Sequence, residues 1–140
     1  MPINEYLKKV KKLYDSGIST EHSYRGDLQV LISSLVKGIS VTNEPKRQKC
    51  GAPDYIIQKK EIPLGYIEAK DIAVDLDKVE KSNQMQRYLG SLDNLILTDY
   101  LEFRFYKYGQ KLKTIKIASV ENGKIKVQSE NLSSFETHIT

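Results

Sequence analysis

Residues 53–70 read PDYIIQKKEIPLGYIEAK, and this stretch decides the fold. It holds two runs rich in β-branched and aromatic residues, Asp54–Gln58 and Leu64–Lys70. Such runs favour β-strands, and the polar stretch Lys59–Pro63 between them is short enough for a turn. The sequence therefore predicts a β-hairpin here.

Three charged side chains gather at the open end of this hairpin. Side chains alternate across a strand, so Glu68 and Lys70 project to one side of the sheet while Ala69 points to the other. With the turn centred near residues 61–62, we expect Asp54 to lie opposite Ala69. Two carboxylates and one ammonium would then share one edge of the sheet. Charged groups at the ends of buried strands are costly unless they are paired or bind a cation.

Two amphipathic helices are predicted before the hairpin. The first spans Pro2–Ser16, and the second runs from Ser19 or Thr20 to Lys37. Both have apolar residues at helical spacing and a glycine that can end the helix. A short strand over Ile39–Val41 and a polar basic loop over residues 43–51 follow.

Helical and strand patterns continue after the hairpin. A loop over Asp71–Asp77 leads to one helix, capped by Asp75 or Asp77, whose buried side carries Val79, Tyr88, Leu89 and Leu92. Further strands are predicted over Asn94–Thr98, Glu102–Tyr106, Leu112–Ala118 and Lys124–Gln128. Residues 131–140 show no clear period. This order predicts an α/β domain with a mixed central β-sheet flanked by helices.

The composition is typical of one globular domain. The 140 residues suffice for one core, and 22 Lys plus Arg against 18 Asp plus Glu leave a formal charge of +4, which weakly favours a polyanionic partner. No apolar run approaches the ~20 residues that span a bilayer, so no membrane partner is expected. Cys50 is the only cysteine, which excludes a disulfide within the chain and a cysteine zinc cluster.

The acidic pair points to a hard metal ion. Converging carboxylates repel each other unless a positive charge lies between them. Mg²⁺ supplies that charge, prefers oxygen ligands, and is held by as few as one or two carboxylates. A bound Mg²⁺ polarises a phosphoryl oxygen and lowers the pKa of a bound water, and Lys70 is placed to orient that water. The reaction class that fits is phosphodiester hydrolysis.

Two helical positions extend the candidate site. Gln84 and Tyr88 are four residues apart on the helix after the hairpin, so they share one face. Glu21 falls in the first turn of the second predicted helix, where it could offer a further carboxylate to a metal-bound water.

Asp54, the run Glu68-Ala69-Lys70 and the run Gln84–Tyr88 together resemble the PD-(D/E)xK nuclease superfamily, with the Gln-xxx-Tyr element of its RecB-like and Mrr-like branches. Residues 51–54, 65–71 and 74–80 are similar to the amino-terminal nuclease domain of single-polypeptide restriction–modification enzymes, including the Type ISP group. The resemblance covers roughly residues 21–106. It implies a restriction-endonuclease-like core, with residues 1–140 as a single nuclease domain at the N-terminus of a longer protein.

The resemblance also implies roles for individual residues. Asp54 and Glu68 would bind Mg²⁺, for which Mn²⁺ could substitute, with the backbone carbonyl of Ala69 as a further ligand. Lys70 would position the attacking water, and Gln84 would support the lysine or the scissile phosphate. Glu21 corresponds to the helix glutamate of the family and would act through a water molecule.

Simpler interpretations stay open for each of these residues. The strand charges could be a solvated salt bridge, and Glu21 could be a carboxylate that stabilises a helix N-terminus. Gln86 rather than Gln84 could point inward, and Tyr88 is expected to pack with its apolar neighbours. Lys46, Arg47 and Lys49 precede the hairpin and could contact DNA phosphates.

The resemblance implies a Mg²⁺-dependent DNA endonuclease that restricts foreign DNA, as in phage defence, in the bacterial cytoplasm. Double-stranded DNA would be the substrate, and motor, methyltransferase and target-recognition domains would lie elsewhere in the polypeptide. This chain has no Gly-rich Walker motif, so we do not expect it to hydrolyse ATP. Two alternatives remain: a DNA-repair or junction-resolving nuclease on the same scaffold, and a non-catalytic DNA-binding module.

Overall fold

The computed structural model describes residues 2–17, 21–43, 53–72 and 74–139. Its helices are α1 (Pro2–Asp15), the 3-10 helix η1 (Glu21–Tyr24), α2 (Arg25–Leu35), α3 (Leu76–Glu80), α4 (Asn83–Ser91) and α5 (Ser129–Ile139). Its strands are β1 (Ser40–Asn43), β2 (Tyr55–Lys59), β3 (Ile62–Ala69), β4 (Asn94–Thr98), β5 (Glu102–Lys107), β6 (Gln110–Lys116), β7 (Ala118–Glu121) and β8 (Lys124–Val127).

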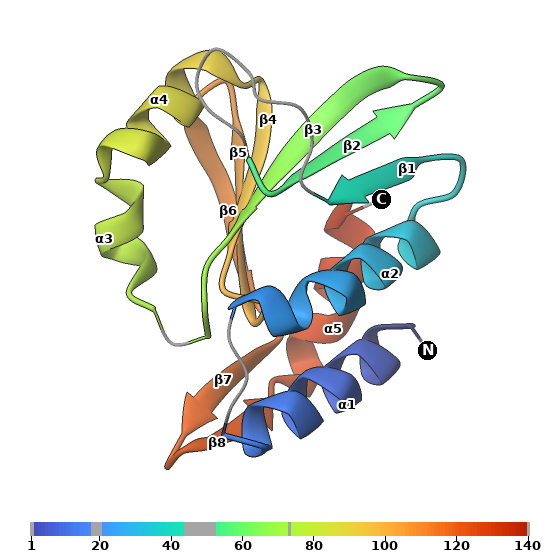
Figure 1. Ribbon diagram of the computed structural model, residues 1–140, viewed down its shortest axis with the longest axis vertical. Helices are drawn as coiled ribbons and strands as arrows, with labels where there is room; N and C mark the ends of the chain where they lie inside the picture. The colour runs from blue at the N-terminus through green and yellow to red at the C-terminus, as the bar shows by residue number, and fades with distance from the viewer. Residues whose placement is uncertain (1, 18–20, 44–52, 73, 140) are drawn as a thin grey trace.

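The described strands form one large sheet and one small sheet. The large sheet has six strands in the order β1-β2-β3-β4-β5-β6, and β7 pairs with β8 separately (Figure 1). β3 and β4 run parallel, and the other neighbouring strands of the described sheets run antiparallel. A parallel step needs a crossover connection, which α3 and α4 provide. The predicted mixed central sheet flanked by helices is confirmed.

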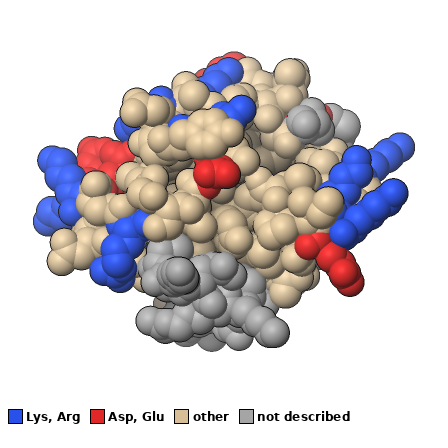
Figure 2. Space-filling model, turned by 90° about the horizontal axis from the view of Figure 1, so that it is seen from above, with Lys and Arg blue, Asp and Glu red and all other residues tan. Residues whose placement is uncertain are grey.

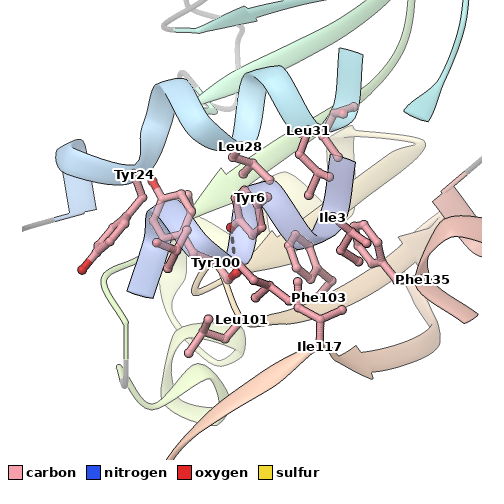
Figure 3. Close-up of a cluster of buried hydrophobic side chains, with 14 of the residues drawn as sticks. Ile3, Tyr6, Tyr24, Leu28, Leu31, Tyr100, Leu101, Phe103, Ile117 and Phe135 are labelled. Atoms are coloured by element: carbon pink, nitrogen blue, oxygen red, sulfur yellow. Dashed lines mark hydrogen bonds between the residues drawn. The ribbon is translucent and has the colours of Figure 1, made fainter. Parts of the chain in front are cut away.

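Helices cover both faces of the large sheet, and each face has its own apolar core. α1, α2 and α5 pack on one face around a cluster that includes Ile67, Ala69 and Phe103. Figure 3 shows part of this cluster, including the hydrogen bond that the Tyr6 hydroxyl donates to the Tyr100 carbonyl at 2.7 Å. α3 and α4 pack on the opposite face around a smaller cluster. Alternate residues of β3 therefore face different cores, as a strand buried on both sides requires.

The predicted hairpin is confirmed, with a tighter turn than expected. β2 ends at Lys59 and β3 begins at Ile62, so Lys60 and Glu61 form the loop. Both loop residues have positive φ, 50° and 68°. Positive φ at both central positions matches the twist of the two strands and is the geometry of two-residue hairpin loops.

The register of the hairpin differs by one residue from the prediction. Tyr55 pairs with Ile67, so Asp54 does not fall directly opposite Ala69. The turn lies one residue earlier in the sequence than predicted, which alone would move the strand pairing by two residues. A register shift between Ile57 and Gln58 of β2 reduces this displacement to one residue. The charged residues at the open end of the hairpin nevertheless lie close together.

Two of the predicted helices are divided. The helix expected after the loop 71–77 is two helices, because the Ser82 side chain accepts the Met85 N–H at 3.2 Å and starts α4. Asp75 caps α3 by accepting the Asp77 N–H at 3.0 Å, as predicted. Of the helix expected from residue 19 or 20 to Lys37, the described part consists of η1 followed by α2, which ends at Leu35.

The C-terminal part departs most from the sequence-based expectation. The strand predicted over Leu112–Ala118 ends at Lys116, and β7 turns away to pair with β8 beside α1 (Figure 1). Residues 131–139, which show no clear period, belong to α5. Phe135 is the buried residue that holds this helix, with its ring centroid 4.6 Å from that of Phe103. Leu132 and Ile139 pack, partly buried, against the same core, so α5 carries apolar residues at helical spacing that the sequence analysis missed.

Among the described residues, no helix is long and apolar enough to cross a lipid bilayer.

Candidate active site

The hairpin brings Asp54 and Glu68 to the same end of the sheet. Asp54 immediately precedes β2, and Glu68 is the penultimate residue of β3. The backbone N–H of Ala69 donates to Oδ2 of Asp54 at 2.8 Å, which ties the two strand ends together. The Lys70 N–H donates to the Thr98 carbonyl at 2.8 Å, so the segment that leaves β3 is also fixed to β4. The two carboxylates therefore sit on neighbouring strands with their main chains held in place.

Lys70 lies between an acid and an amide. Its Nζ is 3.2 Å from Oε2 of Glu68 and donates to Oε1 of Gln84 at 3.4 Å. Glu68 and Lys70 thus project toward the face covered by α4, while Ala69 belongs to the apolar core on the other face. This confirms the predicted alternation along β3. Gln84 enters the site because it lies in the first turn of α4, whose start Ser82 fixes.

Neighbouring positions on α4 have structural roles. Gln86 is exposed, and its Nε2 donates to the Glu80 carbonyl at 2.9 Å. Gln84 is therefore the glutamine that reaches Lys70. Tyr88 is fully buried in the smaller apolar core, as expected for a packing residue.

Glu68 is a buried acid with an unsatisfied oxygen. It is 4% exposed, and its Oε1 has no hydrogen-bond partner among the described residues. Burial and the nearby Asp54 carboxylate raise the pKa of Glu68 from its ordinary 4.5 to about 7. The Lys70 ammonium lowers this pKa but does not cancel the rise. Ionisation of Glu68 is therefore unfavourable in this environment, and a bound cation would favour it.

An arginine that the sequence analysis missed completes the site. Arg25, the first residue of α2, donates from Nη2 to Oδ1 of Asp54 at 2.7 Å. The Tyr55 hydroxyl donates to the Arg25 carbonyl at 3.0 Å and fixes the start of the helix. One signal was available: Arg25 lies one helical turn after Glu21, on the same face of the predicted helix.

Other predicted site residues fall outside the description. The backbone of Glu21 begins η1, but its side chain lies outside the described part of the structure, so its predicted role stays a prediction. Lys46, Arg47 and Lys49 lie outside the described residues altogether. On the face seen in Figure 2, the described Lys and Arg side chains lie mainly toward the margins, and uncharged residues cover much of the surface between them.

A second charged network holds α3 against the sheet. Arg104 of β5, whose side chain is 10% exposed, pairs with Glu102 at 2.6 Å, with Asp77 at 3.0 Å and with Glu80 at 3.0 Å. Glu80 also accepts from Tyr106 and pairs with Lys111 at 3.1 Å. These contacts outweigh burial and lower the pKa of Glu80. The network fixes α3, the helix that precedes α4 and Gln84, and the sequence analysis did not identify it.

The donor set fits one Mg²⁺ better than a metal that needs many protein ligands. No group of three or more His, Cys, Asp or Glu side chains able to hold a metal occurs among the described residues. Mg²⁺ keeps several waters and needs only one or two carboxylates. The observation that fits a cation here is the buried Oε1 of Glu68, which has no hydrogen-bond partner among the described residues.

The mixed sheet with helices on both faces agrees with the restriction-endonuclease-like core expected from the sequence. Among solved structures, the chain is similar to DrdV in the cryo-electron microscopy structure of a DrdV–DNA complex, with a TM-score of 0.76 and 20% sequence identity. The match covers 99% of this chain and 13% of the DrdV chain. At this identity the likeness shows the fold alone.

No protein-family model matches the chain. No curated protein matches it either.

Proposed function

We propose that the chain is the Mg²⁺-dependent DNA endonuclease domain of a restriction–modification protein, with a PD-(D/E)xK site at Asp54, Glu68 and Lys70. The observation that carries this proposal is the meeting of the two carboxylates, one of them with a buried unpartnered oxygen, beside a lysine amine. Oε1 of Glu68 has no hydrogen-bond partner among the described residues, which supports a cation at this position.

The side chains divide the chemistry between them. Asp54 and Glu68 would hold the metal, with the Ala69 carbonyl as the further ligand that the family resemblance implies. When bound, Mg²⁺ supplies Lewis-acid polarisation of the phosphoryl oxygen and makes water a better nucleophile. The Lys70 ammonium, 3.2 Å from Glu68, is placed to orient the attacking water and to stabilise the charge that develops on the phosphate.

Gln84 restricts where Lys70 can point. The ammonium has three donors, and Glu68 and Gln84 take two of them. The remaining donor is available to a water or a phosphate oxygen. Holding the amine in one direction supplies the positioning on which proton transfer and nucleophilic attack depend.

The match to DrdV supports DNA as substrate and a longer protein as context. That neighbour was solved bound to DNA, and the matching region is 13% of its chain. We propose accordingly that this domain cuts double-stranded DNA within a polypeptide that also carries motor, methyltransferase and target-recognition parts, as in the Type ISP group. Restriction of foreign DNA in the bacterial cytoplasm is the proposed role.

The test is nicking of supercoiled plasmid with Mg²⁺, with Mn²⁺ and with EDTA. The wild-type chain should nick with either metal and not in EDTA, and Asp54→Asn and Lys70→Met should reduce nicking by at least about a hundredfold. Asp75→Asn is the matched control, because asparagine caps a helix as well as aspartate does and Asp75 caps α3 away from the site.

Three outcomes would change the proposal. Equal nicking by wild type and Asp54→Asn would remove the metal site. Preferential cutting of branched over linear duplexes would favour the junction-resolving alternative, and DNA binding without any nicking would favour a binding module. Full-length protein should be tested where the domain alone is inactive, since other domains can deliver the DNA.

A further inference from the structure

A cleft of about 730 Å³ opens beside the candidate active site. Part of its lining is Asp71 and Ile72, the two residues that directly follow Lys70. Another part is the turn of the β7–β8 hairpin, through Gly123 and Lys124. A cleft of this volume is the size of an ordinary ligand site. It connects the segment that carries the lysine of the site with a hairpin that has no role in the proposed chemistry.

The β7–β8 hairpin projects from the large sheet beside α1 and is anchored at its base (Figure 1). Its two-residue turn, Asn122 and Gly123, has positive φ at both positions, 53° and 76°, as tight hairpin turns require. Ile125 of β8 is buried in the larger apolar core, to which α1 also contributes. The Gln128 N–H donates to the Ile117 carbonyl at 2.8 Å and closes the base of the hairpin. The backbone of Lys124, directly after the turn, is therefore held in place at the cleft.

Lys124 is an exposed cation, and none of the ion pairs among the described residues involves it. Glu121 lies directly across the hairpin from Lys124. Its carboxylate pairs instead with Lys126, at 3.5 Å. The Lys124 ammonium is therefore available to an anion that enters the cleft.

Other parts of the cleft lining carry the opposite charge. Asp71 and Asp15, the last residue of α1, both contribute to it. Oδ1 of Asp71 accepts the Ile72 N–H at 2.8 Å, which restrains this side chain. Carboxylates repel phosphate groups but accept hydrogen bonds from the amino groups of bases. Among the lining residues of the cleft, Lys124 is thus where a phosphate is favoured.

A DNA strand brings both kinds of group to such a cleft, with phosphates along its backbone and base edges beside them. Phosphate contacts, most often from Lys and Arg, set the position of a protein on DNA. We propose that the β7–β8 hairpin is a DNA-positioning arm, in which Lys124 binds a backbone phosphate that flanks the scissile one. This assignment rests on the proposed nuclease function and adds a surface that holds the substrate.

A phosphate contact has a signature that a structural role lacks. Each phosphate that a lysine neutralises releases bound counter-ions from DNA, so the contact adds about 0.9 to the slope of log affinity against log salt concentration. A folding defect weakens binding without removing one such increment. The salt dependence of DNA binding therefore separates the two explanations.

The experiment measures binding of a fluorescently labelled linear duplex by anisotropy in EDTA, over a range of NaCl concentrations, for wild type, Lys124→Gln and Lys124→Arg. Lys124→Gln should bind about tenfold more weakly at low salt, with a slope less steep by about 1. Lys124→Arg keeps the charge and should restore the wild-type slope. Lys59→Gln is the matched control, because it removes one exposed positive charge at the far end of the β2–β3 hairpin and should keep the wild-type slope.

Nicking with Mg²⁺ gives a second measurement. Lys124→Gln should nick more slowly at low protein concentration but within about threefold of the wild-type rate at saturation, because it removes binding and leaves the reacting groups intact. An unchanged salt slope in Lys124→Gln, or an equal loss of slope in Lys59→Gln, would overturn the arm while Mg²⁺-dependent nicking by wild type still supports the nuclease. Failure of the wild-type protein both to bind the duplex and to nick plasmid would overturn both.

Discussion

Replacing Glu68 by glutamine should stabilise the metal-free protein at alkaline pH while abolishing activity. The pKa of Glu68 rises from 4.5 to about 7 on folding, chiefly because of burial. A group whose pKa is raised in the folded state contributes its stability at low pH and loses it as the pH rises through the folded value. For this residue the loss amounts to about 2.5 kcal/mol between pH 5 and pH 8.

Glutamine keeps the shape of the protonated acid and does not titrate. In EDTA, Glu68→Gln should therefore match wild type at pH 5 and exceed its free energy of unfolding by about 2–3 kcal/mol at pH 8. Urea denaturation followed by far-ultraviolet circular dichroism measures this difference, since the chain has no tryptophan. Glu61→Gln, at the exposed hairpin tip, is the matched control and should follow wild type at both pH values.

Mg²⁺ should reverse the order of stability at pH 8. The metal favours ionised Glu68, so it should stabilise wild type and leave Glu68→Gln nearly unchanged. The reasoning is refuted if Glu68→Gln is less stable than wild type at pH 8 in EDTA, or if Mg²⁺ stabilises both proteins equally.

Three further predictions concern the positioning of Lys70 and the packing of the fold. Gln84→Ala should slow nicking by about tenfold through loss of lysine positioning, while Gln86→Ala should not; equal rates in plasmid assays would contradict the assignment. Arg104→Met should lower the free energy of unfolding by about 2–3 kcal/mol, less than for a fully buried pair because Asp77 is exposed, and urea denaturation that shows no loss would contradict this. Phe135→Ala should cost about 3 kcal/mol by leaving a cavity beside Phe103, and an unchanged denaturation midpoint would show that α5 does not support the sheet.

Local patterns were enough to predict the part of the fold that builds the site. Strand alternation placed Glu68 and Lys70 on one side and Ala69 on the other, and the short polar stretch between two apolar runs marked the hairpin. Helical spacing placed Gln84 and Tyr88 together on one face, which left open whether Gln84 or Gln86 points inward. Only the packed α4 decides between them, through the contact of Gln84 with Lys70.

Long-range partners could not be predicted in this way. Arg25 meets Asp54 because α2 crosses the end of β2, and no sequence spacing encodes that contact. Arg104 appears in sequence as one charge on a strand, yet its partners come from α3 and from its own strand. α5 was missed because its apolar residues Leu132, Phe135 and Ile139 are separated by polar residues, and in the described part of this helix only Phe135 is fully buried.

The central claim is that Asp54 and Glu68 hold one metal ion between them. Crystals of the chain soaked in Mn²⁺ and measured for anomalous scattering test it most directly. The expected result is a single peak at about 2.1 Å from an oxygen of each carboxylate, lost in crystals of Asp54→Asn. A Mn²⁺-saturated crystal with no peak between these two residues, or with its peak retained in Asp54→Asn, would contradict the claim.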